Sequence, residues 1–265
     1  MASLPYCALG RFLLYCCEEV NFSMQNQTLS PRRQLFSLTW PIFLEAVLFS
    51  IIGSMDTLML SGFADDAVGA VGVAGRIMSL FQVISNIITA GTGILCAQYI
   101  GAGKTTQEKQ PLILGALLFN GALGVIFSLT VGLGAPWLLQ LMGVEEAQYD
   151  YAVQYLSIVG CFLFVQMLAV TFTSLIRAHG KTKATMGFSL LMNGLNLALN
   201  YVLIYGHLGF PALGARGAAI ATAISLCFAL VMSSFYLLKF VLPDISFRPD
   251  WPAMKSAVKK ILAYG

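Results

Sequence analysis

The chain has 265 residues, of which 58% are hydrophobic and only 10% are charged. Charged residues make up about a quarter of an ordinary soluble domain, so these few charges could not cover the surface of a soluble fold. The net charge of +3 is too small to indicate a nucleic-acid-binding protein. We therefore expect a protein that crosses the membrane several times.

The first 23 residues differ in character from the rest of the chain. Their apolar run, FLLYCC from Phe12, is too short for the apolar region of a signal peptide, and no small-residue cleavage site comes after it. We expect Met24 to be the natural start and the preceding residues to come from an upstream translation start. The alternative is a short ordered cytoplasmic tail. Because chain ends are commonly disordered, we expect residues 1–30 to be a disordered tail or such an artefact.

Six apolar stretches come next, each long enough to span a bilayer core, which takes about 20 helical residues. They cover residues 35–60, 77–100, 112–139, 151–176, 185–205 and 217–238. Short polar loops separate them. The sequence therefore predicts an all-α membrane protein with six transmembrane helices within residues 31–240.

The last segment has an amphipathic pattern. Over residues 251–265, apolar side chains and lysines occupy opposite sides of a helix; the apolar ones are Met254, Val258, Ile261 and Leu262, and the basic ones are Lys255, Lys259 and Lys260. This pattern predicts a helix on the membrane surface, within a cytoplasmic segment over residues 241–265.

Basic residues concentrate on one side of the predicted membrane. Of the 15 lysines and arginines, all but Arg76 and Arg216 fall in segments on the side of the N-terminus. Cytoplasmic segments hold the excess of basic residues. We therefore expect a multi-pass protein of the cell (inner) membrane with both termini of this chain in the cytoplasm.

The loop after the second predicted helix, GAGKTTQEK, raises the alternative of a nucleotide-binding site. A phosphate loop has the form G-x-x-x-x-G-K-[ST] and comes after a strand. Gln98 stands where the first glycine is required, and a long apolar run precedes the loop. We therefore expect an inner loop between two helices, with Lys104 on the cytoplasmic side, and no nucleotide.

Two acidic residues lie within the first predicted span. An ionisable group inside the membrane costs about 2.5–3.5 kcal/mol even on lenient scales, which makes it a functional candidate. Glu45 and Asp56 are eleven residues apart and so share one helical face. The alternatives are that Glu45 is merely solvated near the inner interface, and that Asp56 only ties its helix to neighbouring helices.

The fifth predicted span carries a row of polar side chains within an arc of about 80°. Asn196 and Asn200 are one turn apart, at a depth comparable to that of Asp56. Amide oxygens beside a carboxylate suit Na⁺, or hold a carboxylate ready for a proton. Asn193 is a candidate cleft-lining residue together with Glu45, although an amide can also simply join helices. The cysteines have no zinc-type spacing, so no other metal is expected.

Several separated motifs resemble the multidrug and toxic compound extrusion (MATE) transporters. They are LTWPIFLEAVLFSIIGSMDTLMLSGF, AQYIGAGK, LMGVEEAQYDYAVQYLSI and MGFSLLMNGLNLALNYVLIYGHLGFPALGARGAAIATAIS, in the order of the family. The resemblance runs from about Arg33 to the end of the chain. It implies six helices that form the N-terminal lobe of a transporter with two lobes.

The resemblance also implies a function and the residues that perform it. The family exports small organic, often cationic, compounds in exchange for Na⁺ or H⁺, without a cofactor. The residues that match its cation site are Asp56, Asn196 and Asn200, and less surely Thr222. Asn200 stands where some relatives have an acid, which is similar to the NorM branch.

One departure from the family is large, because the chain corresponds to a single lobe. A missing C-terminal lobe is therefore an expected partner, besides membrane lipid and the organic substrates. Residues 241–265 are then the linker between lobes. The alternatives are a lipid-linked oligosaccharide flippase of the same superfamily, and a half-protein or scaffold that does not transport.

We expect Lys104→Arg to leave export by the intact transporter unchanged, because Lys104 is assigned to topology and either residue carries the charge. Export of a fluorescent cation from cells is the measurement. A loss above about tenfold, equivalent to 1.4 kcal/mol, would contradict the assignment.

Overall fold

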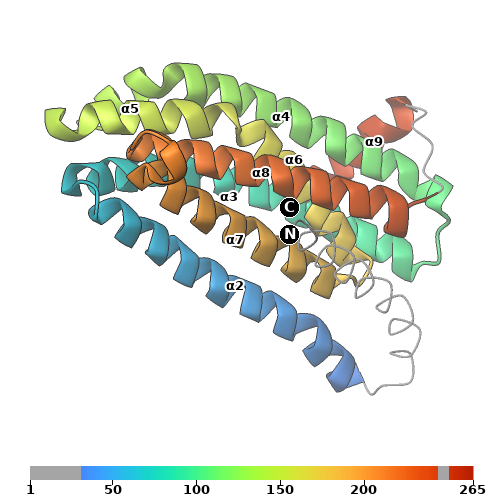
Figure 1. Ribbon diagram of the computed structural model, residues 1–265. Helices are drawn as coiled ribbons and strands as arrows, with labels where there is room; N and C mark the ends of the chain where they lie inside the picture. The colour runs from blue at the N-terminus through green and yellow to red at the C-terminus, as the bar shows by residue number, and fades with distance from the viewer. Residues whose placement is uncertain (1–30, 244–250, 265) are drawn as a thin grey trace.

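The computed structural model describes residues 31–243 and 251–264, and these ranges contain helices and no strand. The helices are α2 (Pro31–Ser61), α3 (Asp65–Gly101), α4 (Thr106–Leu141), α5 (Glu146–Cys161), α6 (Leu163–Ala178), α7 (Thr182–Tyr205), α8 (Ala215–Tyr236) and α9 (Trp251–Tyr264), with a 3₁₀ turn at His207–Gly209 and a π-helical turn at Leu237–Val241. The long helices form one bundle (Figure 1). The tail predicted over residues 1–30 lies outside the described residues.

The predicted membrane architecture is confirmed. α3, α4, α7 and α8 with its π-helical extension are each long and apolar enough to cross a bilayer, and α5 with α6 forms a further span in two pieces. α2 corresponds to the first predicted span, and its 31 residues exceed the about 20 that cross a bilayer core. We call the end of the bundle at the α3–α4 loop the inner end, and the end at the α2–α3 turn the outer end.

The expectation of one continuous helix over residues 151–176 is wrong. α5 and α6 meet at a bend of 48° next to Phe162. Ser128 of α4 donates a hydrogen bond to the carbonyl oxygen of Gly160, at 3.0 Å, and also contacts the carbonyl oxygen of Cys161. Within a membrane a helix tolerates a break only where a neighbour satisfies the released backbone groups, and Ser128 does so here.

Glycines let α4 approach this break closely. A Cβ atom on Gly132 would lie 2.6 Å from the sulfur of Cys161, and one on Gly124 would lie 2.8 Å from the Cα atom of Phe164. Small residues at such contacts allow membrane helices to pack backbone against backbone. The bend is therefore fixed by tertiary contacts with α4.

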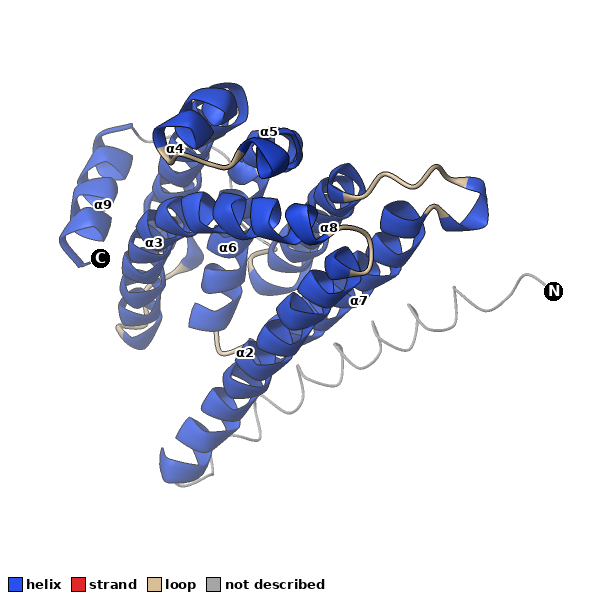
Figure 2. Ribbon diagram, turned by 90° about the vertical axis from the view of Figure 1, so that its left-hand side faces the viewer, coloured by secondary structure: helices blue, strands red, loops and turns tan. Residues whose placement is uncertain are grey.

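α2 lies along α7 at the edge of the bundle (Figures 1 and 2). Its outer end is enclosed, since Leu60 is buried against Ile204 and Ala215, and the Tyr205 hydroxyl donates to the carbonyl oxygen of Met59 at 2.6 Å. Much of the rest of α2 has large apolar side chains that are exposed in this chain, namely Phe36, Trp40, Phe43, Val47, Ile51, Met55 and Leu58. α2 is thus attached to the lobe along one side and at its outer end.

The structure shows contacts of the amphipathic segment that its sequence pattern did not indicate. α9 packs against α3 and α4, and its side chains Met254, Ala257 and Ile261 are buried there. A Cβ atom on Gly115 of α4 would lie 3.3 Å from the carbonyl oxygen of Met254. Much of the apolar side of α9 therefore contacts protein, while Leu262 and the lysines Lys255, Lys259 and Lys260 remain exposed.

The α3–α4 loop is a helix-ending turn that leads into a helix cap. Gly103 has a φ of +68°, and the backbone N–H groups of Gly103 and Lys104 donate to Ile100 and Tyr99 at the end of α3. Thr105 and Glu108 then form a reciprocal capping box at the start of α4. The N–H groups that would hold a phosphate are used to close α3, which agrees with the loop predicted from the sequence.

We expect Gly132→Ala to destabilise the protein by about 1–3 kcal/mol, because the added methyl group overpacks the contact with Cys161. Gly134→Ala is the matched control, since a Cβ atom on Gly134 would meet nothing within 4 Å. Melting temperatures in detergent provide the comparison. Equal melting temperatures for the two variants would show that the close approach does not hold the bend.

Candidate functional site

Three of the predicted site residues lie together near the outer ends of α7 and α8. The Asn200 amide nitrogen donates to the Asn196 amide oxygen at 3.2 Å, and the Asn196 amide nitrogen donates to the Thr222 hydroxyl at 3.5 Å. Thr222 in turn donates to the carbonyl oxygen of Ala218 in its own helix, at 2.9 Å. Asn196 and Asn200 are both buried. We call Asn196, Asn200 and Thr222 the outer amide cluster.

A glycine contact brings α7 and α8 close enough to form this cluster. A Cβ atom on Gly217 would lie 2.5 Å from the carbonyl oxygen of Leu203, so the two backbones touch. The connecting segment is fixed as well, because the backbone N–H of Leu213 donates to the same carbonyl at 2.9 Å. This packing sets Thr222 opposite Asn196.

Asp56 belongs to α2, five residues before the end of that helix. Its side chain lies outside the described residues. Asn200 lies five residues before the end of α7, and the hydrogen bond from Tyr205 to Met59 joins the two outer ends. The backbones of α2 and α7 therefore bring Asp56 and Asn200 to a similar depth in the bundle.

Asn193 has a different environment from the other two asparagines. It is buried, and its amide nitrogen donates to the carbonyl oxygen of Ser189 in its own helix, at 2.8 Å. Asn193 does not line the cavity of about 550 Å³ that Glu45 and Arg177 border. This geometry fits a packing role within α7.

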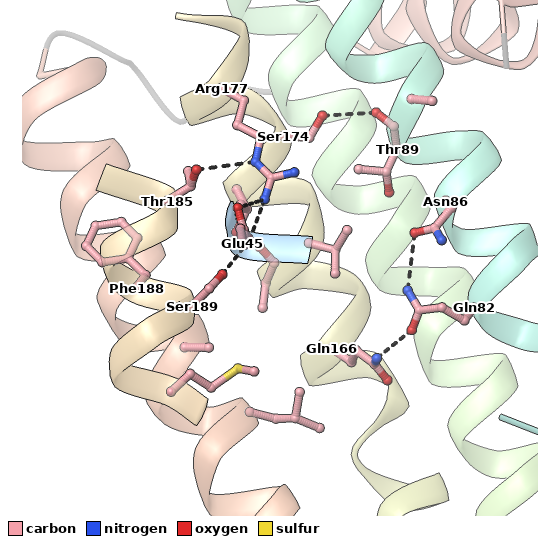
Figure 3. A pocket seen from close by; sticks show the side chains of 17 residues that line it. Glu45, Gln82, Asn86, Thr89, Gln166, Ser174, Arg177, Thr185, Phe188 and Ser189 are labelled. Carbon is pink, nitrogen blue, oxygen red and sulfur yellow. Dashed lines mark hydrogen bonds and ion pairs between the residues drawn. The ribbon is translucent and has the colours of Figure 1, made fainter. Parts of the chain in front are cut away.

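The second polar group lies toward the inner end and joins α2, α6 and α7. Nη2 of Arg177 donates to both carboxylate oxygens of Glu45, at 2.7 and 2.8 Å. The Ser189 hydroxyl donates to the same carboxylate at 2.5 Å, and Nε of Arg177 donates to the Thr185 hydroxyl at 3.3 Å (Figure 3). We call Glu45, Arg177, Ser189 and Thr185 the inner charged cluster.

The alternative of a merely solvated Glu45 is wrong. Its side chain is only 15% exposed, and it is ion-paired with Arg177, whose side chain is 34% exposed. Removing a carboxylate from water is costly unless a partner and hydrogen bonds compensate, and both are present here. Arg177 therefore has a structural role as the partner of Glu45, besides its place among the basic residues from which the orientation is predicted.

The inner charged cluster closes one end of a cavity of about 550 Å³. Gln166 of α6 donates to Gln82 of α3 at 2.5 Å, and Gln82 donates to Asn86 at 3.2 Å, which forms a polar wall (Figure 3). The apolar part of the lining includes Val170, Phe188, Met192 and Leu226. Cavities of about 300–1,000 Å³ with apolar walls and a few fixed polar groups are typical of small-molecule sites.

The polar wall and the role of Arg177 were not predicted from the sequence. Gln82 and Asn86 are four residues apart within an apolar span, a spacing that indicates one shared helical face. That signal was available. The partnership of Arg177 with Glu45, 132 residues away in the chain, had no local signal.

Comparison with known proteins gives the family. The MatE family profile matches residues 41–202, which is more than half of the chain. The chain belongs to the MatE family. It is 36% identical over 233 residues to the "uncharacterized transporter YisQ" of Bacillus subtilis, covering 87% of this chain and 50% of that protein. It is 26% identical over 242 residues to the "probable multidrug resistance protein NorM" of Thermotoga maritima, covering 90% of this chain and 52% of that protein.

Solved structures of the same family have the same fold. A crystal structure of MATE in the bent conformation superimposes with a TM-score of 0.74 at 23% identity, covering 88% of this chain and 52% of that one. An outward-facing MATE transporter gives a TM-score of 0.75 at 22% identity, covering 89% and 53%. An inward-facing one gives 0.70 at 24% identity, covering 82% and 48%. These likenesses confirm the resemblance to the MATE fold.

The chain spans about half the length of the curated relatives it matches. This extent agrees with the single six-helix lobe predicted from the sequence. The names of these relatives are those of transporters and resistance proteins, not of enzymes.

If a cation is held by the outer amide cluster, Asn196→Leu should reduce gradient-driven export by the intact transporter at least about tenfold. Asn196 is bonded on both sides, whereas Asn193 bonds only its own helix. Asn193→Leu should therefore have a milder effect, since hydrogen bonds within membrane proteins contribute about 0.6 kcal/mol on average. Equal losses of export in the two variants would contradict this assignment of roles.

Proposed function

We propose that the chain is one lobe of a transporter that exports small organic, often cationic, compounds in exchange for Na⁺ or H⁺. The observation that carries the proposal is the outer amide cluster, which places two amide oxygens and a hydroxyl inside a membrane-spanning bundle. Relatives named as probable multidrug resistance proteins support the export of organic compounds.

The coupling cation is assigned to Asp56, Asn196, Asn200 and Thr222. Carboxylate and amide oxygens are hard ligands that suit Na⁺, and a carboxylate inside the membrane also takes a proton readily. In either case the cation neutralises a charge that is costly in an apolar setting. No other cofactor is needed for this exchange.

The position of α2 explains how the cation could act on the rest of the lobe. α2 contacts chiefly α7, and it carries Asp56 near its outer end and Glu45 near its inner end. A cation that binds between α2 and α7 favours whichever packing of α2 binds it better. Two packings whose balance shifts on cation binding are what coupling requires.

The distribution of charge supports the proposed orientation in the cell (inner) membrane. The α3–α4 loop, which carries Lys104, and the start of α7, with Lys181 and Lys183, lie at the same end of the bundle as the start of α2 and α9 (Figure 1). Basic residues gather on the cytoplasmic side. This end, and both termini of the chain, are therefore assigned to the cytoplasm.

The flippase alternative is less well supported. A site for a lipid-linked pyrophosphate needs several basic side chains, and Arg177 is the one basic residue among those that line the cavity in the described part of the chain. Its charge is balanced by Glu45. A half-protein without transport activity remains an outcome of the export experiment.

Asp56→Asn tests the proposal, because asparagine keeps the size and hydrogen bonding of aspartate but cannot titrate. In the intact transporter it should abolish export driven by an imposed Na⁺ or H⁺ gradient, while membrane insertion stays normal. Export from inverted vesicles and the amount of protein in the membrane are the two measurements.

Asp56→Ala separates this role from a purely structural one. If Asp56 only ties helices together, Asp56→Ala should misfold while Asp56→Asn exports at the parental rate. Parental export by Asp56→Asn would place coupling elsewhere in the intact transporter and contradict the proposal.

A further inference from the structure

The cavity at the inner charged cluster, here called the inner cavity, is separate from the outer amide cluster. Its lining includes Glu45, Arg177 and Thr185, and it contains neither Asn196 nor Asn200. The same helix, α7, contributes to both places at different depths. The inner cavity is therefore distinct from the site assigned to the coupling cation.

Arg177 retains hydrogen-bonding capacity that faces the inner cavity. A guanidinium group has five N–H donors and no acceptor. Nε is bonded to Thr185, and Nη2 is bonded to Glu45. Nη1 has no acceptor in the described part of the chain, and Figure 3 shows it pointing across the cavity toward the side of Thr89 and Asn86.

Thr89 adds a second unused group on the facing wall. It is 4% exposed, lines the inner cavity, and its hydroxyl has no hydrogen-bond partner among residues 31–243 and 251–264. The Ser174 hydroxyl donates to the Thr89 carbonyl oxygen at 3.1 Å, and Ser174 lies one turn before Arg177 on α6. This bond holds Thr89 opposite the guanidinium group. A buried hydroxyl without a partner is costly, so a ligand gains affinity if rotation of the Thr89 side chain brings the hydroxyl to the cavity surface and the ligand bonds it.

The two charges of the cluster are not equally available to a ligand. Both carboxylate oxygens of Glu45 accept from Arg177, and one also accepts from Ser189, at 2.5–2.8 Å. Arg177 still has a terminal nitrogen to offer. Three of the roughly four acceptor sites of the Glu45 carboxylate are therefore used, which leaves little for a cationic ligand, whereas a carboxylate can bind Nη1 of Arg177 while the ion pair stays intact. The cluster thus favours an anionic group.

Beyond the charged end, the lining suits an apolar body. Val170, Phe188, Met192 and Leu226 form part of it. Methionine is flexible and adapts to ligands of different shape. A volume of about 550 Å³ accommodates a molecule of drug size.

We propose that the inner cavity binds carboxylate-bearing amphipathic compounds, with Nη1 of Arg177 and the hydroxyl of Thr89 holding the carboxylate and the apolar wall holding the ring system. The proposal rests on the proposed function in one respect, namely that such compounds are among those exported. It assigns Arg177 and Thr89 to substrate choice, and it gives Glu45 the task of orienting Arg177 and limiting its charge.

Equilibrium dialysis with the full chain in lipid nanodiscs tests the proposal, with empty nanodiscs subtracted. The probes are 1-naphthaleneacetate, its neutral amide 1-naphthaleneacetamide, and the cation 2-(1-naphthyl)ethylammonium. The acid should bind at least about tenfold more tightly than the amide or the amine, because only the acid brings a negative charge that pairs with the guanidinium group of Arg177. Equal binding of acid and amide, tighter binding of the amine, or no binding of any probe would overturn the proposal.

Variants test the assigned residues. Thr89→Val should weaken binding of the acid at least threefold, while Thr92→Val should not, since Thr92 bonds its own helix at 3.0 Å and lies outside the lining. Glu45→Gln should tighten binding of the acid, because it removes the counter-charge of Arg177. The double variant Glu45→Gln, Arg177→Gln leaves no lone charge and should bind acid and amide alike.

The sign of the Glu45→Gln effect is decisive. Weaker binding of the acid in Glu45→Gln would mean that the carboxylate of Glu45, and not Arg177, holds the ligand. These measurements use no ion gradient, so they stand apart from the test of coupling at Asp56. A chain that binds the acid but whose intact transporter exports nothing would refute the proposed function and leave the site in place.

Discussion

The ion pair between Glu45 and Arg177 is the contact on which the arrangement of the lobe depends most. α2 lies at the edge of the bundle with many apolar side chains exposed, and such surfaces give it no unique position. The charges do, because separating them would leave a carboxylate and a guanidinium group without partners in an apolar setting. Together with the hydrogen bond from Tyr205 to Met59, the pair fixes α2 at two depths.

Two polar sites share the same pair of helices. On α7, Thr185 and Ser189 belong to the inner charged cluster, and Asn196 and Asn200 belong to the outer amide cluster. α2 carries Glu45 at the depth of the inner charged cluster and Asp56, eleven residues later, at the depth of the outer amide cluster. An event at the outer level that changes how α2 packs on α7 therefore also changes the inner cavity. This arrangement offers a physical route from cation binding to the release of an organic ligand.

Much of the fold was predictable because the membrane imposes simple rules on sequence. Span length and the row of asparagines are local patterns, and they located six spans and the residues of the outer amide cluster. The break at Phe162 was not predictable, since the serine that stabilises it lies on α4. The packing of α9 against α3 and α4 was also not predicted, because an apolar stripe on a helix has the same sequence pattern whether it contacts lipid or protein.

The inner cavity was likewise not predictable, because it depends on contacts between residues far apart in the sequence. The residue type of Arg177 and its place after an apolar span indicated only orientation. Its ion pair with Glu45 and its place beside Thr89 depend on how α2, α3 and α6 pack. Sequence patterns identify which polar residues need partners, and the three-dimensional structure identifies the partners.

The central claim is that a cation at the outer level changes the packing of α2. Distance distributions between spin labels at Leu58 on α2 and Leu133 on α4, both exposed positions, measure this directly. The account predicts that adding Na⁺ at constant ionic strength, or lowering the pH, shifts the distribution, and that Asp56→Asn removes the shift. An unchanged distribution under both conditions, in a chain that is otherwise folded, would contradict it.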